Sequence, residues 1–283
     1  MNTIRASIKK KIISIIIENQ TLSRLFRYAL ADKGVLFFRD FDDHALVYYP
    51  HDIIGIMLTE TGEYQRGPVR LIAEIFERNT HALNGSWILE LGGNIGTHTV
   101  YFCKAFEHVK VLTVEADPEN AEVLRRNVQL NKLDNRVEVI CGAVSNYDGQ
   151  IDLVRDYYNR GGASVGGNRS MDRGSIFSTQ CIKVDTLLRQ NGINQDKIGL
   201  IWIDVEGHEL EVFEGMDYLI SKVKPPVFFE FNRRKNVRRS RLLDIVFENY
   251  TSVSISRGGR FDKMTRDDFE DITENVDVFA TND

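Results

Sequence analysis

The sequence contains few of the residues on which several protein classes depend. Cysteine occurs three times in 283 residues, an odd number, and no two cysteines form a C-x-x-C pair. This pattern argues against a disulfide framework or a zinc ribbon. With 5 prolines and 21 glycines, the chain is neither collagen-like nor proline-rich. The net charge of −5 argues against nucleic acid as a partner, because duplex binding depends on a basic surface.

Long hydrophobic runs are also lacking. The apolar run near the N-terminus, residues 12–17, is far below the ~18 residues that a membrane-spanning helix needs. Residues 1–30 carry six basic side chains and one acidic one, which predicts a basic amphipathic helix. Such a helix either docks on its own domain or on a partner, or it binds anionic lipid. We expect a cytoplasmic protein, and the lipid alternative would place it at the inner face of the membrane.

The composition and the hydrophobic pattern are those of a globular α/β protein. Apolar residues make up 42% and charged residues 27% of the chain, whose length suits one large domain with an appendage. Residues 34–58 alternate apolar and polar side chains and predict short antiparallel strands, while residues 67–79 have helical spacing. From residue 86 onward, apolar runs alternate with helical stretches, which predicts a mostly parallel sheet with helices on both faces.

These patterns divide the chain into an N-terminal extension, residues 1–60, and an α/β domain, residues 61–283. The predicted strands of the domain are 87–91, 109–115, 137–141, 198–204, 226–231, 251–256 and 277–280. The predicted helices are 97–106, 118–131, 184–191, 207–222 and 237–249. Glycine is dense in residues 157–173, which we expect to form a mobile loop that orders over the site when ligands bind.

The most informative motif is a glycine-rich turn between a predicted strand and a predicted helix, ELGGNIGTHT at residues 90–99. Glycines at such a turn let the backbone approach a ligand at a helix N-terminus. A dinucleotide fingerprint would need glycine where Asn94 stands. Glu90, two residues before Gly92, opposes a pyrophosphate but suits a cationic ligand such as S-adenosylmethionine. The alternative is an ordinary turn without a ligand.

A second acid lies at the end of the next predicted strand. Glu115 follows Gly92 by 23 residues, the spacing at which a carboxylate accepts hydrogen bonds from both hydroxyls of a ribose. The alternative is that Glu115 only caps the helix that Pro118 opens. The third predicted strand ends before Gly142 and Ala143, whose backbone could contact an adenine.

A third stretch concentrates acids at the end of a predicted strand. Asp204 and Glu206 follow the apolar run 198–203, and ligands of parallel sheets bind beyond the carboxyl ends of strands. His208 lies inside this acidic motif and is a candidate base. Glu230, and with it Asn232, should reach the same edge. The basic run 233–241 that follows is either a solvated helix face or a clamp for an anionic acceptor.

Together these motifs resemble the FkbM family of S-adenosylmethionine-dependent methyltransferases. The resemblance runs from about residue 62 to residue 280 and includes ELGGNIGTHT, VEADP at 114–118, VDTLL at 184–188 and, most specifically, WIDVEGHELEVFEG at 202–215. Family members more often begin the first motif with Asp and have Ala in place of Gly93. The resemblance implies a Rossmann-like sheet of seven strands with the last one antiparallel, and methyl transfer most often to an oxygen of a sugar or natural product.

This resemblance, taken with the motifs, predicts an O-methyltransferase that uses S-adenosylmethionine and no metal. Its acceptor would carry a hydroxyl and could be anionic, and the protein could form a homo-oligomer. The alternatives are an NAD(P)-dependent oxidoreductase on a similar sheet and an adapter that keeps the fold without catalysis. The predicted catalytic residues are Asp204, Glu206, His208 and Glu230. The predicted cofactor-binding residues are Glu90, Gly92, Gly93, Asn94, Gly96, Thr97, Thr99, Glu115, Ala116, Ala143 and Asp204.

Overall fold

The computed structural model describes residues 29, 34–78, 83, 85–156, 160–162, 164–165, 174–231 and 239–282. Several predictions therefore lie outside the described residues. These are the amphipathic helix of residues 1–30, all but five residues of the glycine-rich stretch 157–173, and most of the basic run 233–241, together with Asn232. Among the described residues, no helix is long and apolar enough to cross a membrane.

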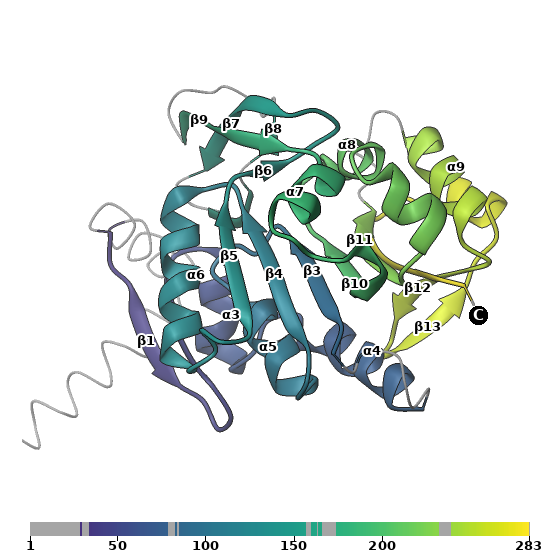
Figure 1. Ribbon diagram of the computed structural model, residues 1–283. Coiled ribbons are helices and arrows are strands. Elements are labelled where there is room, and N and C mark those ends of the chain that lie inside the picture. The colour runs from purple at the N-terminus through teal and green to yellow at the C-terminus, as the bar shows by residue number, and fades with distance from the viewer. Residues whose placement is uncertain are drawn as a thin grey trace, which may run out of the picture.

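The centre of the molecule is an eight-stranded sheet with the order β13-β12-β14-β11-β10-β3-β4-β5 (Figure 1). Five neighbouring strands are parallel, and β14 runs antiparallel to both β11 and β12. All seven predicted strands are present, and the antiparallel last strand is confirmed. The hairpin partner β13 adds an eighth strand at one edge. The strands are β3 (Trp87–Leu91), β4 (Lys110–Glu115), β5 (Val137–Cys141), β10 (Ile198–Ile203), β11 (Val227–Phe231), β12 (Ser252–Arg257), β13 (Arg260–Lys263) and β14 (Val276–Thr281).

Helices cover both faces of this sheet because its central strands are apolar on both sides. Leu89 and Leu91 of β3 belong to the core under α7, α8 and α9, whereas Ile88 belongs to the core under α4, α5 and α6. Such double burial is the pattern expected of parallel strands. The helices are α4 (Arg66–Arg78), α5 (Thr97–Ala105), α6 (Pro118–Leu130), α7 (Val184–Gln190), α8 (Glu209–Glu214) and α9 (Arg239–Asn249), with 3-10 turns at Gln195–Lys197 and Asp267–Glu270.

The predicted helix 207–222 is divided into two pieces. Helix α8 ends at Gly215, and a π-helical turn, Leu219–Val223, follows. A side chain at Gly215 would collide with the carbonyl group of Ser145, so the backbones approach closely here. This contact with a distant segment, which periodicity cannot reveal, ends the regular helix.

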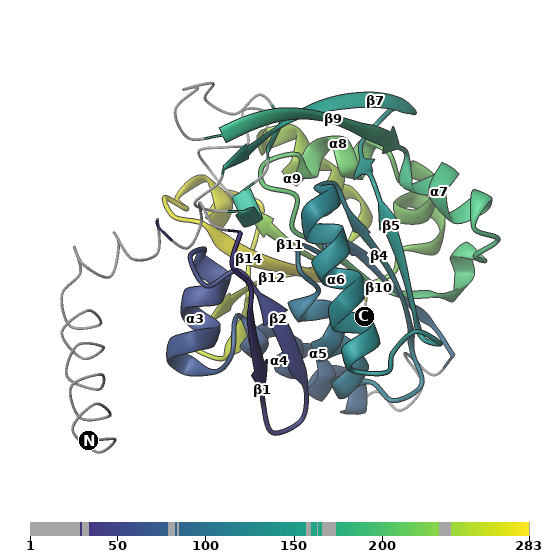
Figure 2. The same cartoon turned by 90° about the vertical axis from the view of Figure 1, so that its left-hand side faces the viewer.

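The N-terminal elements pack against α6 (Figure 2). Strands β1 (Phe37–Asp40) and β2 (Ala45–Tyr48) form the predicted hairpin, but residues 53–58, predicted as strand, belong to helix α3 (Ile53–Thr61). Asp52 caps that helix by accepting from the Gly55 N–H at 2.7 Å. Asn127 and Asn131 of α6 bond to the backbone of β2 at 2.7–3.0 Å. The domain boundary at residue 60 stays a prediction, although residues on both sides of it share one hydrophobic core.

A second sheet, of order β6-β9-β7-β8, follows the carboxyl end of β5 and lies at the top of Figure 1. Its strands are β6 (Ala143–Val144), β7 (Gly149–Asp156), β8 (Ser164–Val165) and β9 (Gly174–Ile182), and a 3-10 turn η1 (Arg160–Gly162) precedes β8. The sequence analysis missed this sheet and was wrong to expect neither helix nor strand across 157–173. β7 pairs antiparallel with β9 over eight residue pairs and with β8 over two.

Candidate active site

The main cleft opens at the point where the strand order of the large sheet reverses. β3 lies between β4 and β10, so the chain leaves it in one direction and returns on the other side. Parallel sheets bind ligands in the crevice that forms there. The cleft has an empty volume of about 1070 Å³, including open solvent. It is lined by residues from the glycine turn, the ends of β4, β5 and β10, helix α3 and the second sheet.

The glycine turn after β3 is fixed against the neighbouring strands. The N–H groups of Gly92 and Gly93 both donate to the Val114 carbonyl, at 2.9 and 3.0 Å. Gly92 has φ +94°, and a side chain there would collide with the carbonyl group of Asp204. This position therefore needs glycine for conformation and for space. Asp204 is placed in turn by its N–H, which donates to the Leu91 carbonyl at 2.9 Å.

Glu115 lies at the end of β4 and faces the cleft. One carboxylate oxygen accepts from the Asn94 N–H and the other from the Asp117 N–H, both at 2.8 Å. A carboxylate has about four acceptor positions, so two backbone donors do not saturate it. The helix cap is Asp117, which accepts from the Glu119 N–H at 2.9 Å. Glu115 is therefore not the N-cap of α6, and its orientation suits a ribose.

Three predicted cofactor residues do not line the main cleft. Glu90 is buried beneath the glycine turn and accepts a hydrogen bond from the Thr99 hydroxyl. Burial raises the pKa of Glu90 to about 7. Gly96 is the N-cap of α5 at φ +83° and packs against Leu124. These three residues support the glycine turn from outside the cleft. The predicted residues that do line the cleft are Gly92, Gly93, Asn94, Thr97, Glu115, Ala116, Ala143 and Asp204.

The predicted catalytic acids converge at the end of the cleft beyond β10. Asp204 and Glu206 line the main cleft and also a second cavity of about 370 Å³, to which Glu230 and Asp277 contribute. Glu230 and Asp277 are directly opposite in the antiparallel pair of β11 with β14. Burial and the negative charges of Glu206 and Glu230 raise the pKa of Asp204 well above its usual value. This end of the cleft is suited to accepting a proton.

His208 lines the main cleft, but both of its ring nitrogens face other side chains. Nε2 is 2.9 Å from the Ser145 hydroxyl oxygen, and Nδ1 is 3.5 Å from a carboxylate oxygen of Glu211. Glu209, from the same acidic motif, is fully buried and accepts from the Gly207 N–H at 2.9 Å. Of the four acids between 204 and 211, Asp204 and Glu206 are therefore the two that line the cleft.

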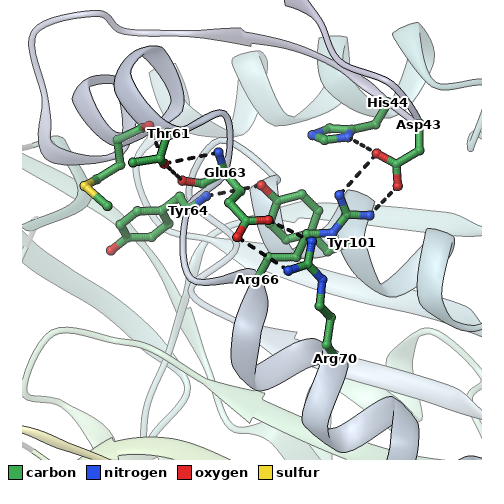
Figure 3. A network of polar contacts seen from close by, with 9 residues as sticks. Asp43, His44, Thr61, Glu63, Tyr64, Arg66, Arg70 and Tyr101 are labelled. Carbon is green, nitrogen blue, oxygen red and sulfur yellow. Dashed lines mark hydrogen bonds and ion pairs between the residues drawn. The ribbon is translucent and has the colours of Figure 1, made fainter. Parts of the chain in front are cut away.

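The sequence analysis missed Tyr64, which lines both cavities. Its N–H donates to the Tyr101 hydroxyl at 3.3 Å, within a network that joins the start of α4 to the β1–β2 turn (Figure 3). In that network Arg66 pairs with Asp43 and stacks over the Tyr101 ring at 4.7 Å. Burial and the nearby carboxylates of Asp204 and Glu206 raise the pKa of Tyr64. A tyrosine between two predicted elements gives no sequence signal of this placement.

His98 and Arg160 also line the main cleft. The sequence predicts that His98 lies beside the cofactor in the first turn of its helix, whereas it gives no prediction for Arg160. His98 packs against Trp202, with ring centroids 4.8 Å apart, and burial lowers its pKa to about 4, so it is neutral at pH 7. Arg160 lies in the 3-10 turn η1 between β7 and β8. The surrounding glycine-rich sequence gives no indication that this residue borders the cleft. Only the tertiary fold brings it beside Asn120 of α6.

The cleft fits S-adenosylmethionine by the chemistry of its residues. The glycine turn leaves room for a ligand to approach the backbone, and Glu115 offers acceptor positions for ribose hydroxyls. Asp204 and Glu206 can stabilise the positive charges of an ammonium and a sulfonium. Glu115, Asp204 and Glu206 therefore match a ligand that is a nucleoside at one end and cationic at the other.

Comparisons with known proteins find methyltransferases among the relatives of this chain. The chain is 27% identical over 158 residues to methyltransferase sdnD of Sordaria araneosa, covering 46% of this chain and 60% of that protein. It is 25% identical over 147 residues to methyltransferase 1 of Beauveria bassiana, covering 47% and 59%. The chain thus spans about 60% of the length of these two relatives. A crystal structure of an FkbM methyltransferase from Methylobacillus flagellatus aligns with a TM-score of 0.46 and 15% identity, covering 69% of this chain and 43% of that one.

The sequence also matches the family described as the methyltransferase FkbM domain over residues 90–266. That segment begins at Glu90 and includes the glycine turn, Glu115 and the acidic motif after β10. It makes up well over half of the sequence, so this chain belongs to the FkbM methyltransferase family.

Proposed function

We propose that this protein transfers a methyl group from S-adenosylmethionine to a hydroxyl of a sugar or natural-product acceptor. S-adenosylmethionine is the cofactor of the family. The observation that carries the proposal is the position of Glu115, held by two backbone N–H groups across the glycine turn from Asp204. This arrangement gives the cofactor a nucleoside end at Glu115 and a transfer end at Asp204.

The transfer end would position the acceptor and take its proton. When bound, S-adenosylmethionine supplies a methyl group that its positively charged sulfur already activates. The protein must then align the acceptor oxygen with the methyl carbon at about 3–3.5 Å. An alcohol is a weak nucleophile at neutral pH, so a base that accepts its proton contributes about 10²–10⁴-fold. We assign this role to Asp204 and Glu206, with Glu230 in support and His208 as the alternative base.

The raised pKa of Asp204 supports this assignment, because a carboxylate with a higher pKa is a stronger proton acceptor. Glu206 has φ +54°, a backbone conformation that side chains other than glycine rarely adopt. Strained positions of this kind cluster at functional sites. A metal-free route stays a prediction, as do an anionic acceptor, a homo-oligomer and lipid contact through residues 1–30.

The test begins with calorimetry of the purified protein with S-adenosylmethionine and with NAD. Binding of the first and not the second supports the proposal, and the reverse would favour the oxidoreductase alternative. A panel of sugars and a cell extract are then incubated with cofactor carrying a radiolabelled methyl group. A labelled ether product is the expected result. Cofactor binding without any labelled product would favour the alternative of a non-catalytic adapter. A labelled amine would contradict O-methylation.

A further inference from the structure

The nucleoside end of the main cleft contains a cation to which the proposed function gives no role. Arg160 begins the 3-10 turn η1, and its side chain is only 8% exposed. It is the one lysine or arginine among the described residues that line the main cleft. Burying a charge costs free energy unless it is paired and hydrogen-bonded. The partners of this side chain therefore indicate what it does.

The protein holds Arg160 from three sides. Nη1 donates to a carboxylate oxygen of Glu119 at 2.5 Å, and the guanidinium group lies 4.2 Å from the centroid of the Tyr49 ring. The side-chain amide of Asn120 donates to the Arg160 carbonyl at 3.0 Å. These contacts fix the residue against α6. The Nε of Arg160 is buried and has no hydrogen-bond partner among the described residues, although unsatisfied buried donors are rare and costly. Arg160 also lines the main cleft, so its guanidinium group can donate an N–H to an acceptor atom on a ligand there.

Asn120 connects this donor to the ribose site. It lies in the first turn of α6, and its side chain is among the groups that lower the pKa of Glu115. Its Oδ1 is also buried without a partner. Asn120 therefore lies between Glu115 and Arg160 and lines the same cleft. A ribose hydroxyl that donates its hydrogen to a carboxylate keeps oxygen lone pairs, which then need a donor.

We propose that Arg160 is a second ribose-binding side chain, which donates an N–H to a ribose oxygen whose own hydrogen is directed at Glu115. The 3-10 turn η1 then forms part of the cofactor site. This inference rests on the proposed function, because the ligand is the nucleoside of S-adenosylmethionine. It assigns a specificity role to a residue outside the glycine turn and the strand ends.

The test compares three ligands by calorimetry: S-adenosylhomocysteine and its analogues that lack the ribose 2′- or 3′-hydroxyl. Wild-type protein should bind S-adenosylhomocysteine at least about tenfold more tightly than one of the analogues. Arg160→Lys keeps the positive charge for Glu119 but replaces Nε by a methylene group. It should bind S-adenosylhomocysteine about tenfold more weakly and discriminate about tenfold less than wild type between the ligands, with Glu115 responsible for the discrimination that is left. Arg160→Gln should show the same loss of discrimination. It replaces the lysine variant in this test if the lysine variant does not fold.

Arg155→Lys is the matched control. Arg155 bonds to Asp117 at 2.6 Å and shares Glu119 with Arg160, but it does not line the cleft. This variant should lower the melting temperature and change affinity for S-adenosylhomocysteine less than about threefold. Unchanged affinity in both Arg160 variants, or equal weakening of all three ligands, would overturn the inference. If wild-type protein binds no S-adenosylhomocysteine at all, the proposed function fails instead.

Discussion

The two ends of the main cleft differ in the groups that surround their carboxylates. At the nucleoside end, Glu115 receives two backbone N–H groups, and Asp117 is neutralised by Arg155 at 2.6 Å. At the transfer end, Asp204 faces Glu206 and Glu230, which raise its pKa together with burial. Burial raises the pKa of both Glu115 and Asp204, but hydrogen bonds oppose this effect at Glu115, whereas neighbouring negative charges add to it at Asp204. The nucleoside end is thus preorganised to bind a ligand, and the transfer end is prepared to take up a proton.

The strongest test of this difference is Glu206→Gln, which removes a negative charge and leaves the shape of the side chain almost unchanged. Turnover should fall at least about tenfold, and by about 10²–10⁴-fold if Glu206 is the proton acceptor. Affinity for S-adenosylhomocysteine should fall less than turnover, since Glu115 and Asp204 are intact. Glu248→Gln removes the same charge at an exposed position and should have no effect. Full activity of Glu206→Gln would eliminate Glu206, and inhibition by EDTA that Mg²⁺ reverses would contradict the metal-free route.

The corresponding change at the nucleoside end is Glu115→Ala. Loss of its hydrogen bonds to the ribose should weaken S-adenosylmethionine binding by about 1.5–3 kcal/mol, measured by titration calorimetry. Glu122→Ala, on the exposed side of the following helix α6, is the control and should leave affinity unchanged. If Glu115→Ala binds as well as wild type, Glu115 does not bind the ribose and the nucleoside end must lie elsewhere.

Gly93→Ala tests how tightly the turn between the two ends is packed. A side chain there would collide with the Thr113 hydroxyl and lie 2.8 Å from a methyl group of Leu124. We expect a loss of unfolding free energy of about 1–3 kcal/mol in urea denaturation. A second change, Thr113→Ala, should recover part of this loss by removing the hydroxyl. Gly149→Ala, where nearby atoms are at an ordinary 3.5 Å, is the control. Unchanged stability of Gly93→Ala would show that the turn can relax.

The pH dependence of binding should report the charge of Glu115. Burial raises its pKa to about 7, so a fraction of the ligand-free protein is protonated there at neutral pH. Ribose hydroxyls donate better to the ionised form, so binding lowers this pKa and releases a proton. Affinity for S-adenosylhomocysteine should therefore rise, less than about tenfold, between about pH 6 and pH 8 and then level off. Glu115→Gln should reduce this rise, and an equal rise in both proteins would assign it to another group.

The smallest effect is expected from His208→Gln. Both ring nitrogens of His208 already face Ser145 and Glu211, so the ring would have to give up a contact to act as a base. Turnover should fall less than about threefold, with S-adenosylhomocysteine affinity unchanged. A loss of about 10²-fold or more would make His208 the base and move proton uptake away from the acids.

Sequence reasoning succeeded where function depends on consecutive residues. The glycine turn and Glu115 follow directly from strand ends, because a strand must deliver the next residue to the edge of the sheet. Sequence reasoning failed where segments that are distant in the sequence pack against each other. The paired strands β7 and β9 flank a glycine-rich stretch, and helix α3 begins within an alternating pattern that read as strand. In both places tertiary packing overrides local propensity.

The sequence by itself determined the α/β alternation, the family and the carboxylate at the end of β4, since each is encoded in short-range periodicity or in a contiguous motif. Only the tertiary structure decided which acids share a cavity, because the facing of Glu230 and Asp277 depends on the register of β11 against β14. It also decided that Tyr64 and Arg160 border the cleft, through contacts with Tyr101 and Glu119. Contacts between such distant residues follow from packing of the whole chain, which local patterns do not specify.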